Sequence, residues 1–422
     1  MYKYLTLFLL LIATPSLFAQ GKTDKLLLKI LKKNKAHFWH ILKYPEDYRV
    51  QILYTRIDRD AANFPIFKSY HYRVDKNEYF YPASTVKFPA CLLALEKLNT
   101  LNKPELNRKS SMLIDSAYAG QTKQYLDKTN TLNSGLPTIE HYIKKILLVS
   151  DNDAYNRLYE FIGQEAFNEG LYKKGYDSLR IVHRLSVPLS REQNRATNPI
   201  EFTKPNSTLY PIYRQPLVVT DKVYEPEKPI VLGKGYMKGG QLVQEPFDFT
   251  YKNHFPIENQ QAILKATLFP ESVPATQRFN LTDDDYKFMW QFMSQLPTET
   301  LTPQYPDADS TGAWDSYCKF FMFGDKKTPM PKNVRIFNKV GDAYGFLIDN
   351  AYVVDFDKKV EFMLTAVIYC NADGVFNDDK YEYDSVGFPF MANLGNAIYN
   401  YEVKRKRKIK PNLSKFVFKY EK

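Results

Sequence analysis

Ser84-Thr85-Val86-Lys87 is the stretch that most restricts the architecture and chemistry of this chain. Pro82 precedes it, and residues 88–98 are rich in helix formers with leucines recurring along one side. Ser84 is therefore predicted near the first turn of a buried helix, with Lys87 on the same face. A serine hydroxyl needs a base to become a strong nucleophile, and a lysine whose pKa is lowered by burial is such a base. The stretch favours a catalytic serine–lysine pair.

Two more strings supply further polar groups. Ser150-Asp151-Asn152 follows a predicted helix over residues 139–147 and precedes another over 154–162. A loop between two helices is able to direct a hydroxyl and an amide into a cleft. Lys339-Val340-Gly341 ends a predicted strand that begins at Arg335. Gly341 leaves room for an acyl group beside that strand, because it has no side chain.

Two of these strings also have chance copies. S-x-x-K recurs at Ser316-Tyr317-Cys318-Lys319, and K-x-G recurs at Lys173-Lys174-Gly175 and Lys238-Gly239-Gly240. Ser150-Asp151-Asn152 occurs once, so it discriminates most strongly. The aromatic residues that follow Ser316 indicate a packed segment, and we interpret that copy as a coincidence.

Each residue taken alone has an ordinary interpretation. Ser84 suits a helix cap, Asn152 a turn and Lys339 a solvated strand end. The ordered set of three strings in suitable contexts favours catalysis instead. In order and chemistry the set resembles the penicillin-recognising serine hydrolases, above all the class A β-lactamases.

The resemblance extends beyond the three strings. Gly341, Tyr344-Gly345, Asp349 and Ala351 are similar to the continuation of the strand in class A enzymes. Residues 195–199, Arg-Ala-Thr-Asn-Pro, are similar to the end of the omega loop of that family. The match spans most of the chain after its leader, apart from an insertion at about 206–256 that is dense in Pro, Gly and Tyr and is expected to rim the active site.

The resemblance implies a role for each polar side chain. The nucleophile is Ser84, the base Lys87, the proton shuttle Ser150, the orienting amide Asn152 and the electrostatic anchor Lys339.

The same resemblance implies that substrate binds along Gly341, Asp342 and Ala343. The oxyanion would be held by the backbone N–H of Ser84 and by an N–H from the strand just after Gly341.

Two departures separate this chain from the class A pattern. Val340 replaces a hydroxyl residue that commonly helps to bind a substrate carboxylate. No Asp or Glu lies between Asp177 and Glu192, where the family places a glutamate that activates water for deacylation. His183 falls near that place, but a packed or solvated histidine is the expected state. Without such a base, the acyl-enzyme is expected to persist, as in penicillin-binding proteins.

The functional prediction is an exported serine hydrolase, β-lactamase-like, that acts on a β-lactam or a related acyl amide. A D,D-peptidase or an esterase with the same acyl-serine chemistry is the second hypothesis. A non-catalytic cell-wall binding protein that retains the cleft is the third.

The predicted fold class is α+β. An antiparallel sheet is expected from strands at both ends of the chain, over residues 48–57, 65–74, 335–340, 346–356 and 360–369. The order of elements predicts one catalytic domain over residues 20–422, with a mixed lobe (20–83 and 333–422) and a mostly helical lobe (84–332) that carries the insertion. Thr23 is expected to cap a first amphipathic helix that extends to Phe38.

Residues 1–19 are predicted to be a signal peptide, with Lys3, a short apolar run and a cleavage point at Ala19. Export to the periplasm or the medium follows. The apolar run is shorter than the roughly 20 residues that a membrane span needs, and no membrane span is predicted elsewhere.

The charge and the potential metal ligands point to no further partner. Much of the net charge of +11 lies in residues 404–408, interpreted as a solvated helix end rather than a nucleic-acid site. The six histidines are scattered, and His37 and His40 lack nearby acids, so neither a metal nor another cofactor is predicted. Cys91, Cys318 and Cys370 are expected to be buried thiols. The sequence leaves the oligomeric state open.

Overall fold

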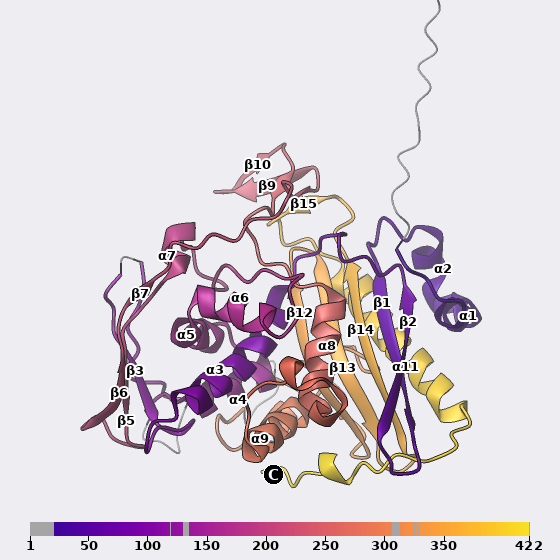
Figure 1. Cartoon of the computed structure of the whole chain (residues 1–422). Coiled ribbons are helices and arrows are strands. Elements are labelled where there is room, and N and C mark those ends of the chain that lie inside the picture. Colours follow the sequence, from indigo (N-terminus) through magenta and orange to yellow (C-terminus); the bar gives the residue numbers. More distant parts are fainter. Residues whose placement is uncertain are drawn as a thin grey trace, which may run out of the picture.

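The structure, a computed structural model, describes residues 21–118, 120–129, 135–305, 313–324, 326–327 and 329–421. A five-stranded antiparallel sheet crosses the molecule in the order β12-β13-β14-β1-β2 (Figure 1). Its strands are β1 (Gln51–Arg59), β2 (Pro65–Tyr72), β12 (Val334–Ala343), β13 (Phe346–Asp355) and β14 (Val360–Tyr369). The two ends of the chain meet in this sheet, where Gln51 of β1 lies opposite Val367 of β14. The predicted α+β class is confirmed, and β12 forms one edge of the sheet.

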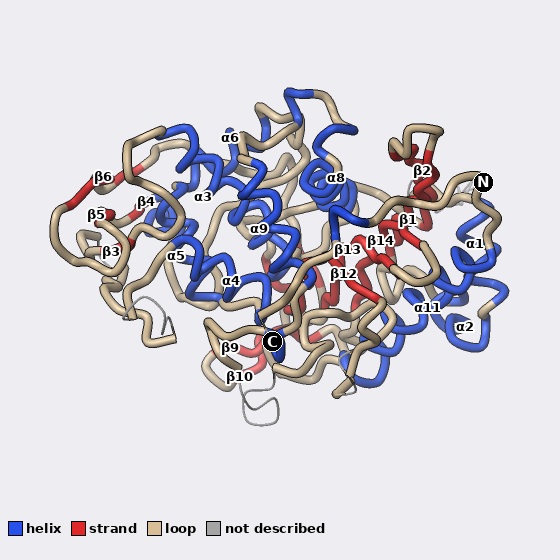
Figure 2. The backbone as a smooth tube through the Cα atoms, turned by 90° about the horizontal axis from the view of Figure 1, so that it is seen from below, coloured by secondary structure: helices blue, strands red, loops and turns tan. Residues whose placement is uncertain are grey.

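One face of the sheet is covered by terminal helices, as the view from below shows (Figure 2). These are α1 (Lys25–Lys33), α2 (Lys35–Lys43) and α11 (Phe388–Lys404). Their apolar sides pack on strand residues such as Ile336, Val340 and Leu364. The prediction of a single first helix capped by Thr23 is wrong. The N-cap is Asp24, because the Thr23 hydroxyl accepts a hydrogen bond from the backbone of Arg73 instead. The helix also ends at Asn34, and a second helix starts at Lys35.

The opposite face of the sheet carries the helices that lead to the site. They are α3 (Lys87–Leu101), α4 (Ile139–Val149), α5 (Asn152–Ile162), α6 (Gln164–Tyr172), α8 (Ile257–Leu268) and α9 (Asp283–Ser294). Helix α8 contacts β13 and β14, and α9 contacts β12. Helix α3 is buried along most of its length and contacts both α4 and α5. Its position explains why residues 88–98 are apolar on nearly every side.

The remaining elements are short. Around the helices lie β3 (Ser111–Ile114), α7 (Arg191–Arg195), β4 (Ala196–Thr197) and β5 (Ile200–Thr203). The predicted insertion contains β6 (Pro211–Gln215), β7 (Val218–Val219), β8 (Val231–Leu232), β9 (Gly235–Lys238), β10 (Gln241–Val243) and β11 (Phe247–Asp248). The parallel pairing of β9 with β15 (Val375–Phe376) ties the insertion to the loop that follows β14.

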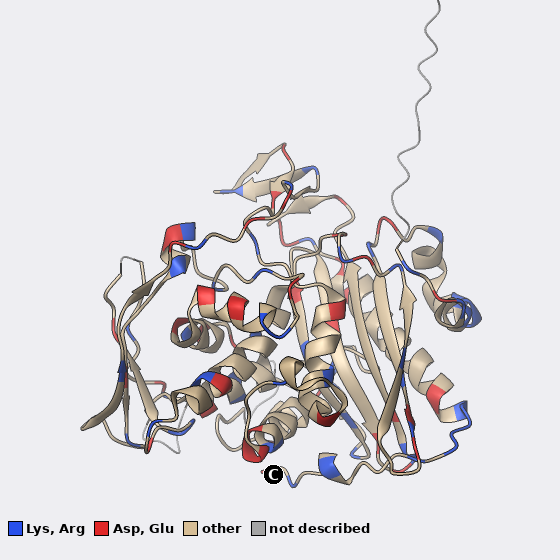
Figure 3. Cartoon of the chain, viewed as in Figure 1, with Lys and Arg blue, Asp and Glu red and all other residues tan. Residues whose placement is uncertain are grey.

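The basic run after α11 is partly used within the fold. Arg405 and Arg407 both donate to the carboxylate of Glu402, which is fully buried, and Arg405 also pairs with Asp58 of the strand β1. Burial raises the pKa of Glu402, and the two arginines oppose that shift. Elsewhere, basic and acidic residues alternate along the ribbon in the view of Figure 3. The run therefore joins the end of α11 to the sheet.

None of the helices in the described ranges combines the length and the apolar character that a membrane crossing requires. The predicted signal peptide, residues 1–19, lies outside the described residues. The three cysteines are buried and unpaired, as predicted.

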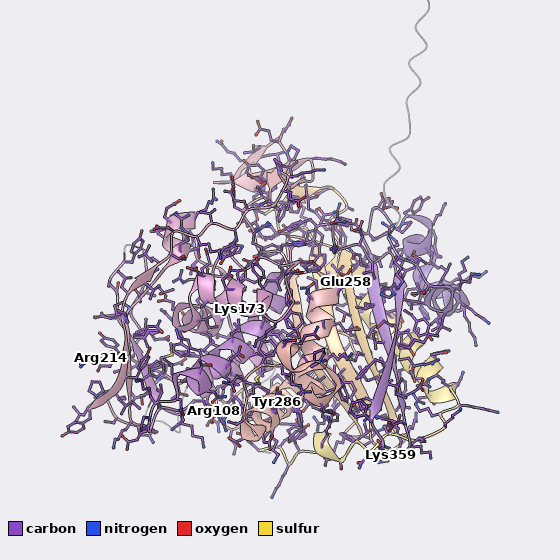
Figure 4. The ribbon with its side chains drawn as sticks, in the orientation of Figure 1. Arg108, Lys173, Arg214, Glu258, Tyr286 and Lys359 are labelled. Carbon is purple, nitrogen blue, oxygen red and sulfur yellow. The ribbon has the colours of Figure 1, made fainter. Side chains whose placement is uncertain are left out.

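A buried ion pair gives a first test of the sheet. Arg59 donates two hydrogen bonds of 2.6 Å to Glu361, and Tyr352 donates a third of 2.7 Å. Arg59→Met leaves this buried carboxylate unpaired and should lower the free energy of unfolding by about 3–5 kcal/mol. Arg214, on β6 at the side of the molecule away from α1 (Figure 4), pairs with Glu201 in solvent. Arg214→Met should therefore change stability by less than about 1 kcal/mol.

Urea denaturation followed by circular dichroism measures both changes. Equal losses in the two variants would contradict the structural role given to the Arg59–Glu361 pair.

Candidate active site

Ser84 lies where a short helical turn meets the edge strand. Residues Ala83–Val86 form a 3₁₀ turn that runs directly into α3, and Ser84 itself is partly exposed. A Cβ on Gly341 would lie 2.8 Å from the Ser84 nitrogen, 2.9 Å from the Pro82 oxygen and 3.0 Å from the Thr85 nitrogen. All three are backbone atoms, so no side chain fits at position 341. The glycine therefore sets how closely β12 approaches the serine.

Lys87 is fully buried one turn further along. Its amine donates to the Ser150 carbonyl, to the Ser150 hydroxyl at 3.3 Å and to the Asn152 side-chain oxygen at 2.6 Å. These three acceptors match the three N–H groups of a lysine. The loop between α4 and α5 thus holds the amine that the sequence predicted beside Ser84.

The hydroxyl of Ser150 lies between two amines. Lys339 donates to it at 2.7 Å and also to the Val340 carbonyl at 2.8 Å. A hydroxyl oxygen has two lone pairs and one proton. When Lys87 and Lys339 both donate to it, its own proton is directed away from them. The hydroxyl of Ser150 is therefore oriented as a proton donor. Ser150 itself ends α4 with its backbone in the left-handed conformation, at φ 59°.

Burial shifts the pKa of both amines. The pKa of Lys87 lies well below that of an ordinary lysine, first because burial penalises its charge and second because Lys339 is positive. Asp151 and Asp342 oppose this shift. The pKa of Lys339 is also lowered, mainly by burial. A neutral fraction of Lys87 is thus available to accept a proton at pH values where a solvated lysine is charged.

A second layer of charges holds the loop. Asp151 accepts a hydrogen bond from the backbone of Ala154 and pairs with Lys145 at 3.3 Å. Lys145 also pairs with Asp127 at 3.0 Å. These contacts fix the start of α5, and with it the side chain of Asn152. The sequence analysis missed Asp127 and Lys145, because no spacing links the loop that carries Asp127 to the end of α4.

Ser186 is a further neighbour that the sequence analysis missed. The side-chain NH₂ group of Asn152 donates to the Ser186 hydroxyl at 2.8 Å. Ser186 has φ 54°, a left-handed conformation that is unfavourable for residues other than glycine. It belongs to the segment between Asp177 and Glu192, which contains no carboxylate, and it offers a hydroxyl there.

His183 and Glu192, the other candidates in that segment, do not face the site as bases. His183 is partly buried, its Nδ1 bonds to the Arg184 carbonyl at 2.6 Å, and its Nε2 accepts from the backbone of Asn253 at 3.2 Å. Burial lowers its pKa to about 4. Glu192 lies on α7 with 63 % of its side chain exposed. Of the two states expected for His183, packed or solvated, the structure shows the packed one.

The second S-x-x-K copy is structural. Ser316 donates to the Lys326 carbonyl at 2.5 Å, while Lys319 donates to Met293 and Asn338, each at 2.7 Å. Asn338 in turn donates to the buried Asp349 at 2.8 Å. This network supports β12 from behind, immediately before Lys339.

The insertion reaches the end of the strand β12. The ring of Tyr344, just after Ala343, lies 4.9 Å from that of Tyr81, 5.5 Å from Phe247 and 5.4 Å from Phe249. Aromatic pairs at these separations pack favourably. Strand β11 and its flanks thus pack against the end of β12, next to residues 341–343.

Comparison with known proteins agrees with the sequence resemblance. The model of the β-lactamase enzyme family matches residues 66–215, which include Ser84, Lys87, Ser150 and Asn152. This match confirms the resemblance over that stretch and supports a β-lactamase-like hydrolase. No curated protein sequence matches.

Several solved structures are similar at low identity. A β-lactamase from Sphaerobacter thermophilus is 12% identical, with a TM-score of 0.46, and the alignment covers 88% of this chain and 97% of that one. A β-lactamase from Desulfarculus baarsii is 11% identical, with a TM-score of 0.46 and coverage of 90% and 98%. A class A β-lactamase from Clostridium kluyveri is 16% identical, with a TM-score of 0.45 and coverage of 88% and 98%.

The contact at Gly341 gives a test of the geometry. Gly341→Ala introduces a Cβ against three backbone atoms, so β12 must move away from Ser84. We expect acylation of Ser84 to slow by about 5- to 150-fold, because overpacking costs about 1–3 kcal/mol and here falls on the approach of β12 to Ser84. The rate of covalent labelling by a reactive acyl probe measures this loss.

Gly170→Ala is the matched control. Gly170 lies inside α6, and its added Cβ meets a leucine side chain rather than backbone. Its labelling rate should stay at the wild-type value. Unchanged labelling of the Gly341 variant would refute the close approach of strand and serine.

Proposed function

We propose that this chain is an exported serine hydrolase that forms an acyl-enzyme on Ser84. The observation that carries the proposal is the placement of the Ser150 hydroxyl between the amines of Lys87 and Lys339, beside the turn that bears Ser84. The match to the β-lactamase family model supports the same reaction class.

In the acylation step, neutral Lys87 accepts the proton of the Ser84 hydroxyl. The serine oxygen then attacks the carbonyl carbon of the substrate, and negative charge develops on the carbonyl oxygen. The backbone N–H groups of Ser84 and Asp342 are the expected donors to that oxygen. As the bond from carbon to the leaving nitrogen breaks, Ser150 passes its proton to the nitrogen. Protonated Lys87 returns a proton to Ser150.

Hydrolysis of the acyl-enzyme needs an activated water. The segment between Asp177 and Glu192 offers no carboxylate, and its residue in contact with Asn152 is Ser186. A hydroxyl is a much weaker base than a carboxylate at neutral pH. We therefore expect acylation to be faster than deacylation, so that the acyl-enzyme accumulates. This balance suits a D,D-peptidase or a slow esterase as well as a β-lactamase.

A penicillin probe separates these functions. Intact-mass analysis of the wild type after incubation with a fluorescent penicillin should show one added probe, and Ser84→Ala should show none. Ser316→Ala should label like the wild type, because that serine is bonded within the fold.

The persistence of the adduct then assigns the function. A stable adduct favours the peptidase-like enzyme and rapid loss favours a β-lactamase. Labelling of Ser84→Ala would exclude Ser84 as the nucleophile. Absence of labelling by both the penicillin and an activated ester would favour the binding protein.

The lowered pKa of Lys87 predicts a pH dependence. Only the neutral amine accepts a proton, so the acylation rate should rise with pH through the pKa of Lys87 and reach its plateau below the range of an ordinary lysine. Stopped-flow fluorescence under single-turnover conditions gives this profile. Lys87→Arg should remove the activity, because a guanidinium stays charged.

Lys97, on the same helix, provides the control. Burial lowers its pKa to about 8, but its amine bonds to Phe161 and Gln215, away from the serine. Lys97→Met should leave the midpoint of the profile in place. A midpoint that moves with this substitution would contradict the assignment of the base to Lys87.

A further inference from the structure

The strand that approaches Ser84 also carries an exposed carboxylate, at Asp342. It directly follows Gly341, whose backbone is in contact with the backbone of Ser84. Its side chain is exposed, whereas Lys87 and Lys339 are buried. With the residues that the structure describes, the Asp342 carboxylate forms no hydrogen bond or ion pair. It is thus a carboxylate at the site that is attracted by the charges of Lys339 and Lys87 but hydrogen-bonded to neither.

The two positively charged side chains of the site already donate hydrogen bonds within the protein. Lys87 donates to three acceptors, and Lys339 donates to Ser150 and to the carbonyl of Val340. An anionic group of a substrate beside β12 would have to displace one of these contacts. Such a displacement would disturb the amines on which acylation depends.

The side chain at position 340 cannot donate a hydrogen bond to an anion either. Val340 is 2% exposed and packs in the apolar cluster behind the sheet. It supplies no hydroxyl, and the next exposed side chain along the strand is that of Asp342. A carboxylate bound there would lie near a like charge, and the two groups would repel each other.

Resting on the proposed acylation of Ser84, we infer that Asp342 selects the charge of the substrate. The preferred group of the substrate along β12 is neutral or cationic, and a compound with a carboxylate at that place is acylated more slowly. The acyl compounds that fit are esters, amides and amino-bearing amides rather than acids. Asp342 acts as a specificity determinant, while the proton transfers remain with Lys87 and Ser150.

Three penicillin derivatives that differ only at the ring carboxylate test this inference. The first keeps the free acid, the second is the methyl ester, and the third is an amide with ethylenediamine, which carries a positive charge. Acylation rates are measured by intact mass as a function of probe concentration. The wild type should react with the ester and the cationic amide at least about tenfold faster than with the acid, relative to the intrinsic reactivity of each probe in hydroxide.

Asp342→Asn is the matching variant. It keeps the size of an exposed side chain, so the fold should be retained. The preference against the acid should fall to within about twofold, and the acid itself should react faster than with the wild type. High salt should reduce the preference of the wild type but leave that of the variant unchanged, because screening acts on the charge interaction. Asp177→Asn, an exposed carboxylate outside the site, should behave as the wild type.

The two proposals fail in different ways. Equal normalised rates for the three probes, or a preference that Asp342→Asn leaves intact, would overturn the charge selection while Ser84 still becomes acylated. Failure of every probe to label Ser84 would instead overturn the acyl-enzyme proposal, and with it the inference that rests on it.

Discussion

The site depends on one hydroxyl held by two buried amines. The Ser150 hydroxyl accepts a hydrogen bond from Lys339 on the edge strand β12 and another from Lys87 on α3. A single oxygen therefore connects β12 with the helices. Two ammonium groups so close together repel each other, and both lose hydration on burial. The arrangement persists because each amine finds further acceptors, at Asn152 and at the carbonyls of Ser150 and Val340. The same repulsion and burial lower the pKa of Lys87, so the electrostatic cost of the arrangement and its chemical use have one cause.

The approach of β12 to Ser84 is the steric counterpart of this electrostatic arrangement. Gly341 allows backbone to meet backbone, and β12 is held from behind by Lys319, Asn338 and Asp349. A strand at the edge of a sheet has unpaired backbone groups on one side. Here that side lies against the turn of Ser84, where donors for a developing negative charge are needed. The rigidity of the buried network therefore reaches the reacting atoms through the strand itself.

Much of the fold can be predicted from the sequence, because apolar residues recur with the period of a strand or a helix. Strands β13 and β14 are predicted within one residue of their ends, since the apolar pattern is a local signal. Ser84 and Lys87 are found because three residues span one helical turn. Ser186 and Asp127 are missed because each meets its partner through loops, where no spacing connects residues that touch. The same applies to Thr23, whose hydroxyl is used by Arg73, a contact that only the folded chain creates.

Acylation and deacylation place different demands on this architecture. In the proposed reaction, the acylating groups come from α3, the loop before α5 and β12, which support one another through hydrogen bonds to Ser150 and Asn152. A deacylating water would have to be held by the segment around Ser186, which is anchored to Asn152 on one side and through His183 to Asn253 on the other. Within the described ranges, the hydrogen bonds that link this segment to Lys87 run through the Asn152 amide, so a substitution near Ser186 reaches that amine through one side chain. The insertion packs on the same segment at Asn253 and on the strand end at Tyr344, so it lies beside both the segment of Ser186 and the end of β12.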